Sequence, residues 1–464
     1  MSLSMIIPIA VDIYWNNDDW KVFFLCMVIT SFFGGSLMLS NANADMNISL
    51  RDAFMLMFLS WIGLSIFASL PFTLSEMDIN YTDAFFEAVS GITTTGSTVI
   101  TGLETVPPGI LIWRAILQWL GGIGIIIMAM SILPTLNVGG MQVFKTELSE
   151  DDKALPRAAK LASSIGGIYL ALTIICALAY VMAGMSNFDA LAHAMTTIAT
   201  GGFSTYDASI GHFDSNVIDG IAITFMVLAG MPFVLFLKAT HGNLIPLLQD
   251  PQVRWFLGIL ASTIIITTIY LGIYQNMSFG QAFMGASFNI TSLMTGTGYA
   301  TENYNQWGGF VLAMLFFLMA MGACAGSTSC GIKIFRFQIF YSVLKIQVKK
   351  LLHPNGIFIP HYNGKPIPED VPLSVMSFLF LYAVCFILLA LLLSAVGLDF
   401  ITALSGAMTS ISNVGPGLGD TIGPNGSFAT LPDSAKWILS IGMLIGRLEI
   451  LAAFVIFHPA FWKH

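Results

Sequence analysis

The chain has 464 residues, of which 56% are hydrophobic and only 9% are charged, and its formal net charge is −8. A soluble globular domain carries about 25% charged residues, so this composition excludes that class. Apolar runs near 20 residues recur along the chain, each long enough to cross a hydrocarbon core about 30 Å thick. The sequence therefore predicts an all-α polytopic membrane protein, since the apolar–polar alternation of a β-barrel is absent.

The apolar segments fall into two length classes. Nine are predicted to span the membrane: 22–39, 53–72, 112–136, 164–185, 216–237, 255–275, 307–336, 373–395 and 434–457. Four are only about 12 residues long and are predicted to be re-entrant: 84–95, 190–201, 286–297 and 403–414. Residues 1–14 are apolar over too short a stretch to cross alone, so a shortened helix or a truncated start is expected there.

Charge predicts the orientation, because cytoplasmic loops carry an excess of Lys and Arg. If the loops after residues 39, 136, 237 and 336 and the C-terminus face the cytoplasm, these regions hold 14 of the 18 basic residues. The outer face then holds 16 of the 26 acidic residues, among them Asp78, Asp83, Glu87, Glu104, Asp189, Asp214 and Asp433. An acidic vestibule would concentrate cations, although acidic residues also fill solvated loops without such a role.

Four polar stretches between the apolar segments are related to one another. "SGITTTGSTV" (90–99), "TTIATGGFST" (196–205), "SLMTGTGYAT" (292–301) and "TSISNVGPGLG" (409–419) each contain one of four glycines, here called the repeat glycines: Gly96, Gly202, Gly298 and Gly415. Twelve residues before each glycine stands Ala, six before stands Ser or Thr, and four before stands Ile or Met. This agreement predicts four units of helix, short helix, polar loop and helix at 51–138, 139–240, 241–350 and 351–464, after an N-terminal segment at 1–50.

The physical setting limits what such loops can do. Irregular backbone at membrane depth is tolerated only where it is buried in protein or lines a water-filled cavity. Four loops from one chain can surround a single axis and present rings of carbonyl oxygens in place of an ion's hydration shell. Glycine reaches the necessary backbone angles cheaply, and short Thr and Ser side chains are expected to satisfy neighbouring amides. The negative ends of the short helices would favour a cation.

These stretches, with "WLGGIGIIIMAMSILP" (119–134), "GACAGSTSCGIKIFR" (322–336) and "GRLEI" (446–450), resemble the Trk/Ktr/HKT superfamily of potassium transporters. The best match is the TrkH-like membrane subunit of bacterial Trk potassium uptake systems. The resemblance implies four units around one pore, one or two extra N-terminal helices, and a homodimer in the bacterial inner membrane. It also implies a cytoplasmic TrkA-like regulatory subunit, and only that partner would bind a nucleotide. No enzymatic activity and no nucleic-acid partner are expected.

The resemblance places a potassium ion at the four loops. The residues expected to form this filter are Thr94, Thr95, Gly96, Thr200, Gly201, Gly202, Gly296, Thr297, Gly298, Asn413, Val414 and Gly415. A second set is expected to form a gate below the filter: Gly322, Gly326, Ser327, Thr328, Ser329, Gly331 and Arg447.

Two features of the sequence suggest that gate. "GACAGSTSCG" (322–331) interrupts the span 307–336 with glycines and small polar residues, which predicts a loop inside the membrane, although small residues also allow close helix packing. Arg447 lies 13 residues into the span 434–457, roughly 20 Å deep, where a charge is costly and indicates function. Glu449 is two positions further on and would face another way on a helix.

Several alternatives stay open at this point. A sodium or mixed potassium–sodium transporter of the same superfamily is one, but plant relatives that pass sodium carry Ser at the position of Gly96. The potassium-binding subunit of a P-type pump shares the fold, but the short loops and "GRLEI" favour Trk. The remote alternative is an intramembrane serine hydrolase that uses Ser327 or Ser329, with His193 as base, although a packing role is favoured for His193. Passive and coupled transport are not distinguished.

Overall fold

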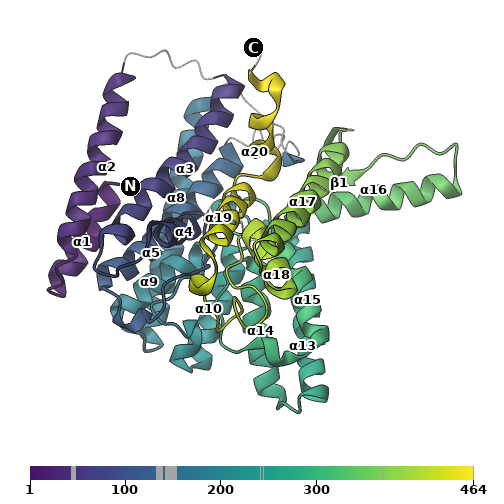
Figure 1. The fold of residues 1–464 in the computed structure, drawn as a ribbon. Coiled ribbons are helices and arrows are strands. Elements are labelled where there is room, and N and C mark those ends of the chain that lie inside the picture. Colours follow the sequence, from purple (N-terminus) through teal and green to yellow (C-terminus); the bar gives the residue numbers. More distant parts are fainter. Residues whose placement is uncertain are drawn as a thin grey trace.

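The computed structural model describes residues 1–42, 49–131, 139–141, 154–240, 242–243, 245–368 and 370–462. Figure 1 shows an assembly built almost entirely of helices. The only sheet in the described part is a hairpin of two two-residue strands, β1 (His361–Tyr362) and β2 (Lys365–Pro366), which pair antiparallel. Six helices are long and apolar enough to span a membrane, or eight if two bent pairs each count as one span. The all-α polytopic fold is therefore confirmed.

The N-terminal segment forms one short and one long helix. A 3₁₀ turn at Leu3–Met5 leads into α1 (Ile6–Tyr14), and α2 (Trp20–Ser40) follows. The nine residues of α1 confirm the shortened helix expected there. Asp12 of α1 is buried, and its Oδ1 accepts a hydrogen bond of 2.7 Å from the Gly109 amide. This contact attaches α1 to the start of α5, where backbone amides have no partner within their own helix.

The rest of the chain repeats one pattern four times: a long helix, a short helix and a second helix. The first three copies are α3 (Leu50–Leu74), α4 (Tyr81–Ile92) and α5 (Pro108–Ser131); α8 (Ala154–Met182), α9 (Asn187–Ile198) and α10 (Asn216–Ala229); and α13 (Pro251–Tyr274), α14 (Phe279–Thr295) and α15 (Gly309–Ala320). The fourth is α17 (Asp370–Ala395), α18 (Phe400–Ser412) and α19 (Asp433–Arg447). The four short helices occur where the re-entrant segments are predicted, but α14, with 17 residues, is longer than expected. The exact limits of the four units stay predictions, and residue 138 lies outside the described residues.

The short helices begin earlier than the apolar pattern predicts, because a polar residue caps each one. The side chains of Asn80, Ser186, Ser278 and Asp399 accept hydrogen bonds from amides in the first turns of α4, α9, α14 and α18. Such caps satisfy amides that the helix itself leaves free. A count of apolar residues misses this polar first turn.

Two predicted spans are wrong as single helices. The segment 216–237 is bent by 94° between α10 and α11 (Phe233–Thr240), and 434–457 is bent by 107° between α19 and α20 (Ile450–Phe457). Pro232 stands at the first break, where a proline removes a helical donor. Glu449, with a φ of 60°, stands at the second. The end of the predicted span 112–136 and the basic residues Lys145 and Lys153 lie outside the described residues.

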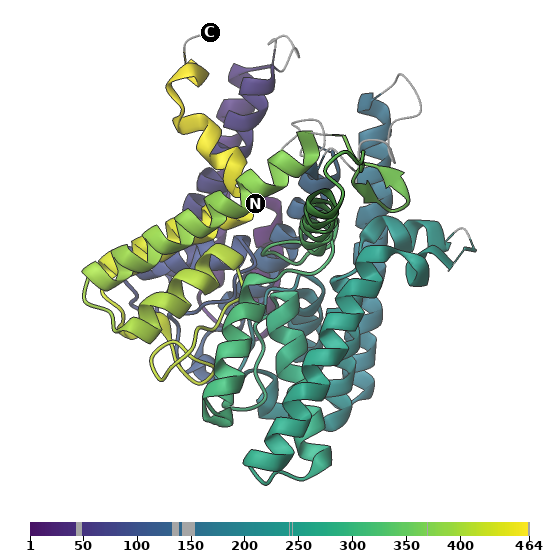
Figure 2. The ribbon, with the colours of Figure 1, turned by 90° about the vertical axis from the view of Figure 1, so that its right-hand side faces the viewer.

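The predicted interruption of 307–336 is confirmed. The chain leaves α15 at Ala320 and enters α16 (Ile334–Leu352) after a loop. Figure 1 shows α16 lying across the direction of α15 and α17, and Figure 2 views it nearly end-on. The remaining elements are α12 (Ile245–Gln249) and the 3₁₀ helices Leu103–Thr105, Ser209–Phe213, Tyr304–Trp307, Phe428–Thr430 and Pro459–Trp462.

The orientation derived from charge can be tested by labelling. All five native cysteines are buried, so the unaltered chain should stay unlabelled by a membrane-impermeant maleimide. Ala208→Cys lies on an exposed loop of the acidic face and should label in intact cells. Lys350→Cys, at the exposed end of α16, should label only after the membrane is permeabilised. The reverse labelling pattern would show that the orientation is inverted.

Candidate ion pathway

The loops that follow α4, α9, α14 and α18, here called loops 1 to 4, leave their helices in the same way. In each, the residue two positions before the repeat glycine has a φ between 50° and 74°: Thr94, Thr200, Gly296 and Asn413. The amide of the next residue donates to the carbonyl five positions back, at 2.9 to 3.1 Å: Thr95 to Ser90, Gly201 to Thr196, Thr297 to Ser292 and Val414 to Thr409. This is the Schellman helix ending, and the sequence repeat reflects it.

Three of these left-handed residues are not glycine, which makes the geometry informative. A β-branched residue such as Thr94 or Thr200 rarely adopts a positive φ, and such a conformation costs of order 1–3 kcal/mol. It persists because the surrounding contacts fix it. The Asn413 amide supplies one such contact, since its Nδ2 donates to the Thr95 hydroxyl at 2.9 Å and to the Met443 carbonyl at 3.0 Å.

The repeat glycines bring the four loops into one ring. All four have positive φ, from 78° to 110°. A Cβ atom at Gly96 would overlap the carbonyl oxygen of Gly201, one at Gly202 would overlap that of Thr297, and one at Gly298 would overlap that of Val414. A Cβ atom at Gly415 would lie 2.8 Å from the carbonyl oxygen of Thr95. The contacts run from loop 1 to 2, 3, 4 and back to 1, so the loops close around a single axis.

The hydroxyl groups of the loops bond in two ways. Thr98 Oγ1 and Ser204 Oγ accept from the Ile100 and Tyr206 amides, both at 3.1 Å, so the expectation that hydroxyls satisfy neighbouring amides is confirmed there. The hydroxyls six residues before the repeat glycines donate to carbonyls instead: Ser292 to Tyr299 at 2.7 Å, Thr409 to Gly415 at 3.0 Å and Thr196 to Ala192 at 3.1 Å.

A cavity of about 160 Å³ opens on the outer side of the ring. Gly96, Gly202 and Gly298 form part of its wall, and the charged groups among its lining residues are Arg114 and Asp207. Asp207 accepts hydrogen bonds from the Gly102 and Leu103 amides at 2.7 and 3.0 Å. The cavity thus gives access to the ring from the face that is predicted to be outer, with the Asp207 carboxylate beside it.

The predicted acidic vestibule needs correction, because several of its members are structural. Glu87 is fully buried and pairs with Arg114 at 2.8 Å. Asp83 pairs with Lys436 at 2.5 Å, and the buried Asp189 accepts from the Thr205 hydroxyl at 2.7 Å. Carboxylates that are paired or hydrogen-bonded inside the protein present little free charge to an approaching ion, so the sequence overcounted the acids available for steering.

Below the ring lies the inner loop, residues 321–333, which carries the predicted gate. Its two ends are joined by hydrogen bonds of 3.0 Å from Gly322 to the Ile332 carbonyl and from Ile332 to the Ala320 carbonyl. A Cβ atom at Gly296, in loop 3, would lie 3.8 Å from the amide nitrogen of Cys330. The inner loop therefore sits directly against the ring.

The break between α10 and α11 accommodates this loop. The Cys324 amide donates to the Gly230 carbonyl at 3.1 Å, and the Phe233 amide donates to the Gly326 carbonyl at 2.9 Å. Thr328 Oγ1 donates to the Ala229 carbonyl at 3.2 Å. Backbone groups released by the bend are thus satisfied by the loop, as the membrane interior requires.

Arg447 is the last residue of α19 and is 1% exposed. It donates to the Gly121 carbonyl of α5 at 2.9 Å and to the Thr328 carbonyl at 3.4 Å, and it also contacts Cys330 Sγ. Glu449 is not its partner, since Glu449 pairs with Arg336 at 2.6 Å. Arg447 therefore ties the inner loop to α5, in agreement with its predicted place beside the loop but at a helix end that the sequence did not reveal.

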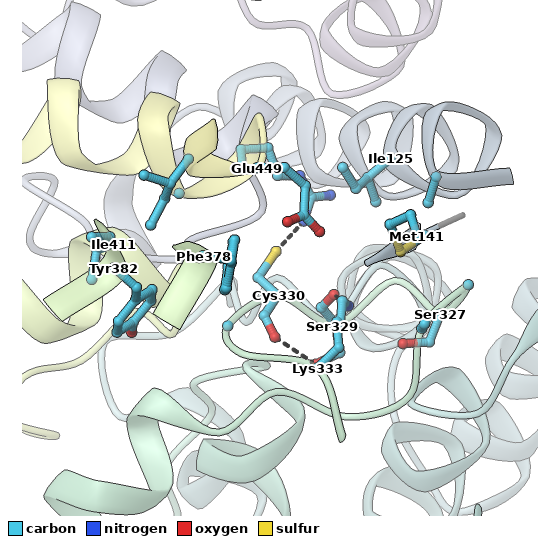
Figure 3. A pocket seen from close by; sticks show the side chains of 17 residues that line it. Ile125, Met141, Ser327, Ser329, Cys330, Lys333, Phe378, Tyr382, Ile411 and Glu449 are labelled. Carbon is cyan, nitrogen blue, oxygen red and sulfur yellow. Dashed lines mark hydrogen bonds between the residues drawn. The ribbon is translucent and has the colours of Figure 1, made fainter. Parts of the chain in front are cut away.

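A cavity of about 30 Å³ remains between the inner loop and α19, which is room for no more than about two water molecules. Figure 3 shows Phe378 and Tyr382 on one side of it and Ile125 and Met141 on the other, with Cys330 between them. The Lys333 ammonium group donates to the Ser329 carbonyl, and both residues line the cavity. The inner loop and α19 therefore leave little free space between them.

The structure closes loops 1 to 4 around one axis and places the inner loop against loop 3, but the sequence missed the side chains that hold the loops. Glu87, Arg114 and Gln118 contact loops 1 and 2. In the sequence, the only indication of this role is that the three residues are polar and lie on otherwise apolar helices.

The serine hydrolase alternative requires a histidine beside Ser327 or Ser329. These serines instead donate to the carbonyls of Cys324 and Cys330, and His193 bonds to Asp189 and Ser204. The hydrogen bonds within the described part of the chain thus put no histidine beside either serine.

Comparison with known proteins identifies the family. A sequence model of the TrkH family, described as a cation transport protein, matches residues 20–464. The chain belongs to the TrkH family. Its TrkH-family relatives include the Trk system potassium uptake protein TrkI of Halomonas elongata, which is 42% identical over 100% of this chain and 94% of that protein. The Trk system potassium uptake protein TrkH of Escherichia coli K12 is 37% identical over 99% of this chain and 96% of that protein.

The fold agrees with a solved TrkH structure. The crystal structure of the potassium transporter TrkH from Vibrio parahaemolyticus matches with a TM-score of 0.92 at 35% identity, over 99% of this chain and 96% of that chain. TrkH-family proteins are cation transporters, so the expectation that the chain is not an enzyme is confirmed. The chain is a multi-pass protein of the bacterial inner membrane, as predicted.

Arg447 gives a direct test of the inner loop in this TrkH-family chain. The glutamine side chain in Arg447→Gln is too short to reach both Gly121 and Thr328, so the inner loop should loosen. Maximal cation flux in liposomes should then rise roughly tenfold, which corresponds to a barrier lowered by about 1.4 kcal/mol. Arg447→Lys keeps the charge but loses the forked contacts. If Lys behaves like Gln, the contacts hold the loop, and if Lys behaves like Arg, the charge itself is the barrier. Unchanged flux through a folded Gln variant would make Arg447 purely structural.

Proposed function

We propose that this chain carries potassium into the bacterial cell through the ring formed by loops 1 to 4. The observation that carries the proposal is the closed cycle of contacts between each repeat glycine and the carbonyl before the next one. The relatives TrkI and TrkH, which align over nearly the whole chain, are named potassium uptake proteins, and this supports the choice of ion.

Backbone oxygens would replace the hydration shell of the ion in this ring. The residues we assign to potassium binding are Thr94, Thr95, Gly96, Thr200, Gly201, Gly202, Gly296, Thr297, Gly298, Asn413, Val414 and Gly415. The short helices α4, α9, α14 and α18 end at these loops, so the negative ends of their dipoles lie beside the ring and favour a cation. No metal-binding group of three or more His, Cys, Asp or Glu side chains occurs in the described residues, in keeping with a site built from backbone oxygens.

Passage past the ring would be controlled by the inner loop with Arg447. The loop residues we assign to the gate are Gly322, Gly326, Ser327, Thr328, Ser329 and Gly331, and the cavity between this loop and α19 holds only about 30 Å³. Arg447 adds a positive charge next to the path. Two charges 4 Å apart interact by about 4 kcal/mol at an effective dielectric constant near 20, so a shift of this side chain away from the axis would ease the passage of a cation.

The cytoplasmic face would receive a regulatory subunit of the TrkA type, which would carry any nucleotide, and two copies of this chain would form a homodimer. The support for the docking face is its charge. Lys349 and Lys350 lie exposed in the last turn of α16, and α16 extends away from the helices around it (Figure 1). An acidic or mixed surface on the partner would complement this region.

Reconstitution in liposomes tests the potassium proposal. The unaltered chain should take up potassium in preference to sodium, under imposed potassium, sodium and proton gradients that also separate passive from coupled transport. In Gly96→Ser the added Cβ would overlap the Gly201 carbonyl, so the ring must distort and the potassium-to-sodium ratio should fall by roughly tenfold, or about 1.4 kcal/mol.

Two results would count against this proposal. Preferential sodium uptake by the unaltered chain would favour the sodium-transporting alternative, for which the same ring would serve another ion. An unchanged ratio with normal flux in Gly96→Ser would remove Gly96 from the selective part of the path.

The docking proposal is tested by charge reversal. Lys349→Glu with Lys350→Glu should reduce co-purification with a TrkA-like subunit, and the remaining binding should depend less on salt, because salt screens exposed charges beyond about 8 Å at physiological ionic strength. Lys21→Glu is the matched control, since Lys21 is 61% exposed at the opposite face. Equal binding by the double variant and the control would place the docking surface elsewhere.

A further inference from the structure

A second repeat, separate from the repeat glycines, appears on the short helices. Nine residues before the repeat glycine, loops 1 to 3 are preceded by Glu87, His193 and Asn289, all fully buried. In the fourth unit that position is Gly406, and the neighbouring Ser405 points to the loop instead. The four side chains differ in charge and size, so the sequence repeat does not reveal that they occupy related places.

Each of these side chains bonds to its own loop, two or three residues after the repeat glycine. Glu87 Oε2 accepts from the Val99 amide at 2.9 Å, and Asn289 Oδ1 accepts from the Thr301 amide at 3.3 Å. Ser405 Oγ accepts from the Leu418 amide at 3.0 Å. In three of the four units, a side chain of the short helix therefore accepts a hydrogen bond from the equivalent loop amide, that of the third residue after the repeat glycine.

In the second unit the short helix contacts its loop through a hydroxyl group and not directly through an amide. His193 Nδ1 lies 2.8 Å from the Asp189 carbonyl, which can only accept, so Nδ1 carries the proton and Nε2 is free to accept. Nε2 lies 2.9 Å from Ser204 Oγ, two residues past Gly202. Ser204 Oγ in turn accepts from the Tyr206 amide at 3.1 Å. Both ring nitrogens of His193 thus have hydrogen-bond partners, and the bond to Ser204 fixes loop 2.

The first unit adds an ion pair that links two loops. The Arg114 guanidinium donates to Glu87 Oε1 at 2.8 Å, to Thr98 Oγ1 in loop 1 at 3.1 Å and to the Ser204 carbonyl in loop 2 at 2.8 Å. One turn further along α5, Gln118 donates to the Gly201 carbonyl at 2.6 Å and accepts from the Phe203 amide at 3.0 Å. Loops 1 and 2 are therefore held together from behind, through α5.

We propose that Glu87, His193, Asn289 and Ser405 are positioning residues that set ion selectivity by holding the outer limb of each loop, and that the Glu87–Arg114 pair couples loops 1 and 2. This inference rests on the proposed function of the ring. The carbonyls that would contact the ion lie between two fixed points in each loop, the Schellman bond on the inner side and the side-chain bond on the outer side. Loss of the side-chain bond on the outer side would let the carbonyls shift. A ring that can adjust its size in this way discriminates less between cations.

Glu87→Gln tests the first unit while conserving shape. Both carboxylate oxygens of Glu87 accept bonds from N–H groups, Oε1 from Arg114 and Oε2 from Val99. In Gln one of these positions becomes an NH₂ group, which cannot accept. Asn289→Leu removes the corresponding acceptor in the third unit, independently of any charge. In each variant the potassium-to-sodium uptake ratio in liposomes should fall roughly tenfold.

Asp83→Asn is the matched control. Asp83 lies one turn before Glu87 on α4 and forms a partly buried ion pair with Lys436 of α19. This ion pair joins two helices and involves no residue of loops 1 to 4, so its loss should lower the melting temperature of the purified protein without changing the uptake ratio. A general loss of stability is thereby separated from a loss of selectivity.

The outcomes are distinct. A reduced ratio in Glu87→Gln and Asn289→Leu, with the control unchanged, supports the inference. An unchanged ratio in both folded variants overturns it, even if their melting temperatures fall, because the side chains would then serve stability alone. A reduced ratio in Asp83→Asn as well would also overturn it, since any damage to a short helix would then suffice. Failure of the unaltered chain to prefer potassium would instead refute the proposed function, independently of the variants.

Discussion

The close approach between each repeat glycine and a carbonyl of the next loop is the contact on which the rest of the structure depends. Four loops can meet at this distance only if no side chain intervenes, and Gly96, Gly202 and Gly298 leave no room for a Cβ atom. The loops must also arrive at the axis with their amides already satisfied, because the membrane interior supplies no water to do it. The Schellman endings meet this condition, and they require short helices that stop at the same depth.

The same requirement explains the breaks in the second helices. A continuous helix satisfies its own carbonyls and has none to offer. The bend after Ala229 and the end of α19 at Arg447 free backbone groups near the inner loop. The Ala229 and Gly230 carbonyls bond to that loop, and Arg447 bonds to the loop and to α5. An irregular segment inside the membrane is therefore stabilised by irregularities in its neighbours, which makes the inner loop and the helix breaks one structural element.

The backbone of the ring is nearly symmetric, whereas the side chains behind it are not. A glutamate in an ion pair, a histidine, an asparagine and a serine hold corresponding parts of the four loops. A ring of four identical subunits could not vary in this way. In a single chain each unit can be supported differently, so that the geometry of the ring is preserved while the stiffness of each quarter is set separately.

The sequence by itself determined the helical membrane fold, the four units and the positions of the loops. These follow from apolar segment length and from glycines that occur wherever backbone must approach backbone, and both are local properties. Tertiary structure alone decided which polar side chains hold the loops and where the second helices of the second and fourth units break. Glu87 looks like one more outer-face acid, and Arg447 looks like a residue within a continuous helix, until their partners are known. The partner of Arg114 lies 27 residues away and that of Arg447 lies 119 residues away, distances at which sequence spacing holds no information about contact.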